Sequence, residues 1–125
     1  MLPLTRIDHI RLRVSDPERA ERFYRDILGL DLLGRTPDGG AWLGGRDGRF
    51  ALALSAEDGD GSASPVEFGY EVDPAADLED LAQKLRDSGV VITKAPGEGE
   101  DPRPGAGGFS VSDPAGNTVW IVSPA

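Results

Sequence analysis

The chain contains a single histidine, His9, and no cysteine, so few side chains are available for nucleophilic, redox or metal chemistry. Without cysteine there is no thiolate nucleophile, disulfide, cysteine-bound zinc or iron–sulfur cluster. Any serine–histidine relay or imidazole–metal site must therefore use His9. Acidic residues outnumber basic ones by 22 to 13, and the formal net charge is −9. This acidity argues against a nucleic-acid partner and against binding to an anionic membrane surface.

His9 lies in a segment that has the pattern of a strand with one buried face. In residues 7–14, IDHIRLRV, apolar residues alternate with His9, Arg11 and Arg13. The two arginines therefore share a face with His9, where an arginine could bind a carboxylate or phosphate of a ligand bidentately. The alternative for Arg13, near the end of the strand, is a solvated or ion-paired side chain.

The elements that follow must position this strand. Asp16 can cap a helix with Pro17 at its first position, and apolar residues then recur with helical spacing up to Gly29. This spacing predicts a helix over residues 17–28. Shorter apolar segments between glycine-rich turns predict three strands, over residues 30–35, 41–43 and 50–55.

The same pattern then starts again. Residues 66–72, VEFGYEV, alternate like residues 7–14, and Glu67 aligns with His9 at an offset of 58 positions. The Asp-Pro pair that begins the first helix recurs as Asp73-Pro74, followed by a helical stripe and strands near residues 90–93, 109–112 and 118–122. We therefore predict an α+β fold of two βαβββ modules, over about 5–56 and 66–123, joined by a loop at 57–65. The polar strand faces would line a cup, with the helices on the outer face.

Two further observations concern location and the long loop. No apolar run approaches the ~18 residues of a membrane span, and the N-terminus lacks the basic-then-apolar pattern of a signal peptide. We therefore expect a cytoplasmic protein. The segment 94–107, rich in Gly, Pro and acidic residues, could cover the cup as a lid or form a solvated linker.

Both ends of the chain resemble one known superfamily. The opening IDHIRLRVSDPERAERFYRDILGL and the closing GFSVSDPAGNTVWIV resemble the vicinal-oxygen-chelate proteins, which include glyoxalase I, bleomycin-resistance proteins and type I extradiol dioxygenases. The resemblance covers nearly the whole chain. It implies one domain over residues 1–125, with a cupped, partly open mixed sheet. Because the family is functionally diverse, the fold alone does not define the activity.

The resemblance also implies where a metal would bind. The family's metal ligands come from four cup-facing positions, which hold His9, Ala53, Glu67 and Trp120 in this sequence. His9 and Glu67 could bind Zn, Ni, Mn or Fe and could also act in catalysis. Ala53 and Trp120 offer no lone pair to a metal. Since a catalytic cation usually has three or more protein ligands, the prediction is either no cofactor or an incomplete divalent-metal site.

Aromatic residues suggest a different use for the cup. A tryptophan at the position of a metal-binding carboxylate would give a flat or apolar ligand a stacking surface. The alternatives are that Trp120 fills a hole in the core and that Trp42 packs against the opposite half. The predicted ligand-binding residues are Arg11, Trp42, Ala53, Phe109 and Trp120.

Three functions remain open from the sequence. The first is a protein that binds a small aromatic or cationic organic molecule, as the bleomycin-resistance branch does; members of that branch are dimers, so a homodimer is expected. The second is a metal-dependent lyase or dioxygenase of the glyoxalase type that uses His9 and Glu67. The third is a metal-free enzyme in which His9 or Glu67 is a general base.

Overall fold

The computed structural model describes residues 3, 7–37, 39–45, 50–56, 66–99 and 106–123. The chain divides into two compact units, Met1–Ser64 and Pro65–Ala125. The predicted loop at 57–65 lies outside the described residues, as do residues 100–105 of the predicted lid or linker.

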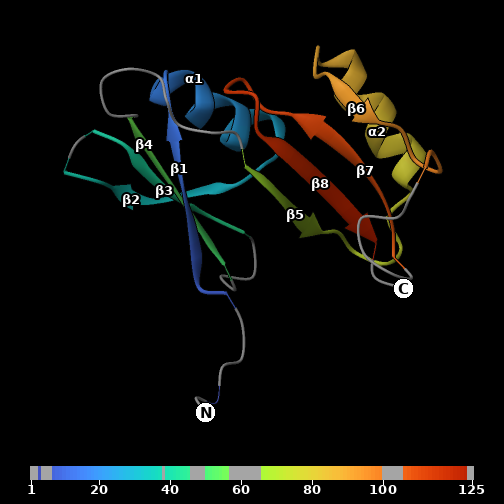
Figure 1. Cartoon of the computed structure of the whole chain (residues 1–125), viewed down its shortest axis with the longest axis horizontal. Coiled ribbons are helices and arrows are strands. Elements are labelled where there is room, and N and C mark those ends of the chain that lie inside the picture. The colour runs from blue at the N-terminus through green and yellow to red at the C-terminus, as the bar shows by residue number, and fades with distance from the viewer. Residues whose placement is uncertain are drawn as a thin grey trace. The chain divides into compact units, whose positions relative to one another are not determined.

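The first unit is a mixed four-stranded sheet with a helical segment (Figure 1). Its sheet order is β1-β4-β3-β2, with β1 parallel to β4 and the other neighbours antiparallel. In chain order, its elements are β1 (His9–Val14), α1 (Pro17–Arg22), η1 (Phe23–Ile27), β2 (Asp31–Arg35), β3 (Ala41–Gly44) and β4 (Ala51–Ala56).

The helical segment of the first unit begins where the sequence predicts. The Asp16 carboxylate accepts a hydrogen bond from the backbone N–H of Arg19 at 3.1 Å, and a proline occupies the first turn. The second part, η1, is π-helical: the N–H of Leu28 donates to the carbonyl of Phe23 at 3.1 Å. Phe23 and Tyr24 are both buried there, with their rings 5.1 Å apart. The predicted helix over 17–28 is therefore confirmed in extent, with a π-helical second half.

The second unit repeats this arrangement. Its sheet order is β5-β8-β7-β6, with β5 parallel to β8 and the other neighbours antiparallel. The prediction of an α+β fold with two βαβββ-like modules is confirmed. The elements of this unit are β5 (Glu67–Glu71), α2 (Leu78–Asp87), β6 (Ile92–Lys94), β7 (Gly107–Ser112) and β8 (Thr118–Ser123).

The start of α2 differs from the prediction. Asp73-Pro74 does not begin the helix; instead, Asp73 accepts a hydrogen bond from the N–H of Ala75 at 2.9 Å within a turn. Asp77 caps α2 and accepts from the N–H of Asp80 at 3.3 Å. The aligned Asp-Pro pairs therefore have different roles, because a second capping aspartate lies directly before the apolar stripe of α2.

In each unit the helix covers one face of the sheet (Figure 1). Along β1 and β5, the exposed residues alternate with the more buried ones, so the polar residues lie on the other face. The largest fully buried side chains of the first unit are Leu12, Val14, Tyr24, Leu43, Leu52 and Leu54. Those of the second unit are Phe109, Val111 and Val119. Within the described residues, no helix is both long and apolar enough to cross a membrane.

Candidate functional site

On the first sheet, a row of four paired residues crosses the face opposite the helix. Arg11 of β1 pairs with Ala53 of β4, Ala53 pairs with Trp42 of β3, and Trp42 pairs with Gly34 of β2. Residues paired across neighbouring strands project from the same face of a sheet. We call these four residues the first row. From edge strand β1 to the opposite edge strand β2, the row holds a cation, a small residue, a tryptophan and a glycine.

The side chains of the first row contact each other across the small residue. The Arg11 guanidinium lies 5.5 Å from the centre of the Trp42 ring, within cation–π range, and donates a hydrogen bond to the hydroxyl of Ser55. The His9 ring meets Trp42 edge-on with 5.3 Å between centres, and His9 Nδ1 is 2.9 Å from a carboxylate oxygen of Asp8. Trp42 therefore already has two protein neighbours on this face.

On the second sheet, the equivalent row holds the same kinds of residue in the opposite order. Gly69 of β5 pairs with Trp120 of β8, Trp120 with Ser110 of β7, and Ser110 with Lys94 of β6. The Lys94 ammonium lies 5.0 Å from the centre of the Trp120 ring. The hydroxyls of Ser110 and Thr93 are 2.7 Å apart. We call Gly69, Trp120, Ser110 and Lys94 the second row.

The edge strand of the second sheet borders a pocket of about 340 Å³. Trp120 forms part of its wall and is half-buried, so this ring lines a pocket instead of filling the core. Burial raises the pKa of the Tyr70 hydroxyl on the helix-facing side of the same strand. The lining residues are Glu67, Phe68, Gly69, Tyr70, Glu71, Trp120 and Val122, all of the second unit.

The edge strand that forms this pocket is anchored by the turn between β7 and β8. Asn117 accepts a hydrogen bond from the N–H of Val66 at 2.9 Å, and the N–H of Thr118 donates to the carbonyl of Val66 at 2.9 Å. Asn117 is held in turn by Asp113, whose carboxylate accepts from its backbone N–H at 2.8 Å and from its side-chain amide at 2.9 Å. The DPAGN turn therefore has a structural role, because it places the start of β5 beside β8.

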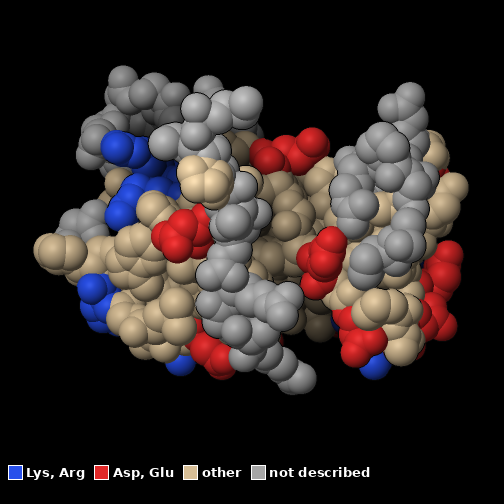
Figure 2. Space-filling model, turned by 90° about the horizontal axis from the view of Figure 1, so that it is seen from below, with Lys and Arg blue, Asp and Glu red and all other residues tan. Residues whose placement is uncertain are grey.

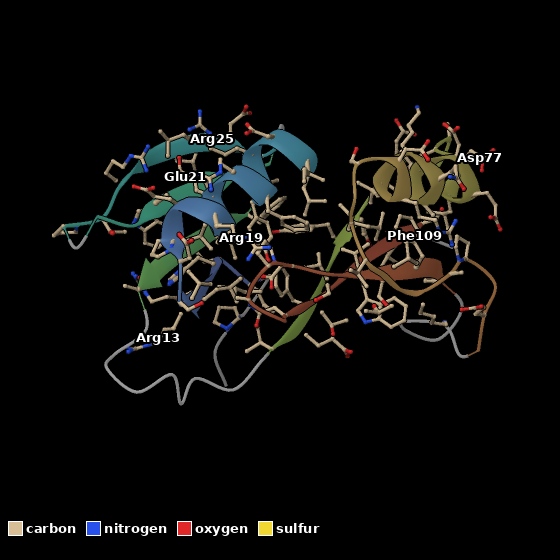
Figure 3. The ribbon with its side chains drawn as sticks, turned by 90° about the horizontal axis from the view of Figure 1, so that it is seen from above. Arg13, Arg19, Glu21, Arg25, Asp77 and Phe109 are labelled. Atoms are coloured by element: carbon tan, nitrogen blue, oxygen red, sulfur yellow. The ribbon has the colours of Figure 1, made fainter. Side chains whose placement is uncertain are left out.

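Charge differs between the two sheet faces. The polar residues of β1 on the row face are His9, Arg11 and Arg13, whereas β5 has carboxylates on both sides of Gly69. Figure 2 shows Lys and Arg side chains mainly over the first unit and mostly Asp and Glu side chains over the second. Arg13, labelled in Figure 3, lies on the side of β1 away from α1.

Not all predicted ligand-binding residues lie on these faces. Phe109 is fully buried on the side of β7 that carries α2 (Figure 3), so it belongs to the core and not to the face of Trp120. Its partner across the strands is Ile121, whereas Trp120 pairs with Ser110. Ala53 lies on the row face but is fully buried between the strands that carry Arg11 and Trp42. Ala53 therefore offers almost no exposed surface to a ligand, and its small side chain leaves room between Arg11 and Trp42.

The comparison with known families agrees with this duplicated architecture. A model of the Glyoxalase/Bleomycin resistance protein/Dioxygenase superfamily matches residues 6–121. The chain belongs to this superfamily. No curated protein matches this superfamily member in sequence.

Several solved structures share the fold of this superfamily member. An integron cassette protein from the mobile metagenome of V. cholerae is 19% identical with a TM-score of 0.78, covering 100% of this chain and 99% of that chain. Lactoylglutathione lyase from Agrobacterium tumefaciens is 22% identical with a TM-score of 0.74, covering 97% and 95%. TnmS3, an antibiotic binding protein from Streptomyces sp. CB03234, is 24% identical with a TM-score of 0.73, covering 100% of both chains. At these identities the likeness shows the fold alone.

The metal positions of the superfamily do not fit a metal in this member. Ala53 has no donor atom, and the indole nitrogen of Trp120 carries a hydrogen and cannot bind a cation. Over the ranges that the structure describes, no three His, Asp or Glu side chains gather as metal ligands would. His9 belongs to the first unit and Glu67 to the second. Two donors are fewer than a catalytic divalent cation usually has from protein.

Three residues of these faces were missed by sequence reasoning. Ser55 binds Arg11, Lys94 contacts the Trp120 ring, and Gly69 lies beside Trp120. Alternation along the strands could have placed Ser55 and Gly69 on the correct faces. The position of Lys94 depends on an irregularity in the β6–β7 pairing, between residues 92 and 94, which no sequence pattern indicates.

Proposed function

We propose that this superfamily member binds a small organic ligand in the pocket of its second unit. The observation that carries the proposal is the half-buried Trp120 in the wall of that pocket, at a position where a metal ligand would be expected. An aromatic side chain with its surface on a pocket favours stacking with a flat ligand. The proposal is also supported by TnmS3 from Streptomyces, which has the same fold and is an antibiotic binding protein.

The two tryptophans differ in how much of their surroundings the protein already occupies. Trp42 is contacted by Arg11 and His9, while Trp120 is contacted by Lys94 and has only a glycine beside it on β5. A ligand therefore finds more unoccupied space next to Trp120. Arg11 and Trp42 are kept in the proposal as a second, smaller contact region.

The experiment is a titration of the purified full chain with aromatic and cationic compounds, followed by tryptophan fluorescence and by calorimetry. For a compound that binds, we expect Trp120→Phe to lower the affinity about 3- to 10-fold, because the phenyl ring offers a smaller stacking surface than the indole and a complete ring contact contributes about 0.5–1.5 kcal/mol. We expect a smaller loss for Trp42→Phe. Affinity unchanged by Trp120→Phe, or no binding by any compound, would contradict the proposal.

A metal titration separates binding from metal-dependent catalysis. The protein is loaded with Zn²⁺, Ni²⁺, Mn²⁺ or Fe²⁺, desalted, and analysed for bound metal. We expect no stoichiometric retention, because two of the four family positions lack a donor atom. Stoichiometric retention that His9→Ala abolishes would replace this proposal with a metal-dependent lyase or dioxygenase using His9 and Glu67.

Homodimer formation and cytoplasmic location stay predictions. The dimer is tested by size-exclusion chromatography with light scattering, where a mass of twice 13.2 kDa is expected. A monomer mass over the whole concentration range would contradict it.

A further inference from the structure

The space beside Trp120 exists because the neighbouring residue on β5 is a glycine. A Cβ atom at position 69 would lie 3.0 Å from the Cβ of Trp120 and 3.5 Å from a methyl group of Val122. Any larger side chain would therefore occupy the pocket at this point. We call the space above Gly69 and beside Trp120 the Gly69 gap.

The backbone does not require glycine at this position. Among the described residues, the glycines with positive φ are Gly29, Gly39, Gly89, Gly97, Gly99 and Gly116, and Gly69 is not one of them. Glycine inside a strand weakens it, because the unfolded chain is more flexible and no side chain packs on the neighbours. In the folded molecule, the missing side chain of Gly69 lets β5 approach the Cβ of Trp120 closely and leaves the space above this contact to the pocket.

The first unit shows what can occupy this space. Gly69 and Arg11 are equivalent, because each pairs with the equivalent residue of the next strand, Trp120 or Ala53. In the first unit the Arg11 guanidinium extends from this position to a tryptophan ring 5.5 Å away. In the second unit the same position carries no side chain, and the tryptophan is the immediate neighbour. A cationic compound from outside the protein could take the place of the arginine side chain, with its flat part against the tryptophan.

The charges beside the gap favour a cation. Glu67 and Glu71 are two residues before and after Gly69 on the same strand, so all three project from the same face. Both glutamates are exposed and line the pocket. A carboxylate accepts hydrogen bonds and attracts an ammonium or amidinium group. Lys94, on the far side of the second row, would disfavour a second positive charge on the ligand.

We propose that Gly69 determines ligand specificity, so that the pocket takes a planar aromatic compound with one positive charge. The ring lies in the Gly69 gap against Trp120, and the charge pairs with Glu67. This inference rests on the proposed function and names the chemical class of its ligand.

The test uses three probes with the same ring and different charge: 2-naphthylmethylamine, 2-naphthylmethanol and 2-naphthoate. Their affinities for the full chain are measured by calorimetry at neutral pH and moderate salt. We expect the protonated amine to bind about tenfold more tightly than the alcohol, and the anionic naphthoate to bind most weakly. Equal affinities for all three probes would overturn the inference. If Trp120→Phe then weakened all three, the proposed binding function would still stand.

Two glycine variants test the gap itself. Gly69→Ala should lower the affinity for the amine at least ~5-fold, and Gly69→Val further, because the added atoms fill the ring's space. The matched control is Gly34→Ala at the end of the first row, where an added Cβ meets no atom within 4 Å. A loss in Gly34→Ala without one in Gly69→Ala would overturn the inference and place the ligand in the first unit. Circular dichroism establishes that each variant is folded.

A charge variant makes the test independent of the glycine substitutions. Glu67→Gln keeps the shape of the side chain and should lower only the affinity of the amine, about 3- to 10-fold, leaving the alcohol unchanged. Glu79→Gln, in the exposed first turn of α2, is the control and should change neither affinity. An unchanged amine affinity in Glu67→Gln overturns the role given to its charge. If none of the three probes binds the wild type, the inference fails, whereas the proposed function fails only if no compound of the wider titration binds.

Discussion

The two units use one backbone plan to present opposite surroundings to their tryptophans. In the first row, Arg11 reaches Trp42 across Ala53, and Gly34 follows. In the second unit the order reverses: a lysine at the far strand contacts Trp120, and the glycine lies on the edge strand β5. On the row face, β1 of the first unit therefore carries cationic side chains. On the same face of the second unit, β5 has a glycine with a carboxylate on each side of it.

This difference shows that the repeated sheet and the chemistry of its face are separate properties. Strand order and pairing are the same in both units, because they depend on backbone hydrogen bonds and on apolar residues facing the helix. The residues on the other face are not needed for that packing. They can change in size and charge without changing the fold, and in this protein the two halves have diverged at equivalent positions.

The largest loss of stability is expected from a substitution in the turn between β7 and β8, which anchors the start of β5. Asp113→Ala removes acceptors for the N–H groups of Ala115 at 3.0 Å and of Asn117 at 2.8 Å, and for the Asn117 side chain. Because Asp113 is buried, we expect the free energy of unfolding to fall by about 2–4 kcal/mol, measured by urea denaturation. Asp73→Ala, in an exposed Asp-Pro turn, is the control, and its loss should stay below ~1 kcal/mol. Equal losses in the two variants would show that the burial of Asp113 adds nothing to the free energy of unfolding.

A substitution in the first row tests whether the order of its residues affects the stability of the first unit. Ala53→Trp places in the first unit the residue that the second unit has at the equivalent position. Ala53 is fully buried next to Arg11 and Trp42, so the larger ring must displace them, and we expect a loss of about 1–3 kcal/mol in stability. Ala56→Trp, at the exposed end of the same strand, should cost less than ~1 kcal/mol. Both are measured by chemical denaturation. An Ala53→Trp variant as stable as the wild type would mean that the two orders are interchangeable.

The smallest loss of stability is expected from the ion pairs of the helices. Glu21 of α1 binds Arg25 of η1 at 2.9 Å and also Arg35 of β2 (Figure 3 labels Glu21 and Arg25). Both arginines are exposed, whereas the Glu21 side chain is half-buried. Hydrogen bonding from Arg35 is the main cause that lowers the pKa of Glu21 below its ordinary value of 4.5. The stabilisation is therefore present above that value and is lost as the pH falls through the lower pKa of the folded protein.

Accordingly, Glu21→Gln should lower the melting temperature at pH 7 by about 1–3 °C, a small shift because solvent screens the exposed arginines. The difference from the wild type should shrink below about pH 4. In α2 the pair of Asp80 and Lys84, 3.1 Å apart, lies within the helix and is more than half exposed, so Asp80→Asn should produce no measurable change. A constant difference from pH 7 to pH 3 for Glu21→Gln would refute the ionic explanation.

Much of the fold could be predicted from the periodicity of the sequence. Alternation in residues 7–14 and 66–72 gave both edge strands and the faces of His9 and Glu67, and the helical spacing after Asp16 gave the first helix. The start of α2 was misplaced because two aspartates compete as caps, and only packing of the apolar stripe decides between them. The burial of Phe109 could not be predicted, because a buried aromatic residue and a ligand-binding one have the same local pattern.

The sequence by itself determined the duplicated βαβββ plan and the single imidazole at His9, which follow from spacing along one strand or helix and from residue type. Together with the resemblance to the superfamily, it also determined that Ala53 and Trp120 offer no side-chain atom to a metal. The tertiary structure decided which residues of different strands meet: Arg11 with Trp42, Lys94 with Trp120, and Gly69 beside Trp120. The physical reason is that side-chain neighbours across a sheet depend on strand order and register, including the irregular pairing near Lys94, and these arise from interactions between segments far apart in the chain.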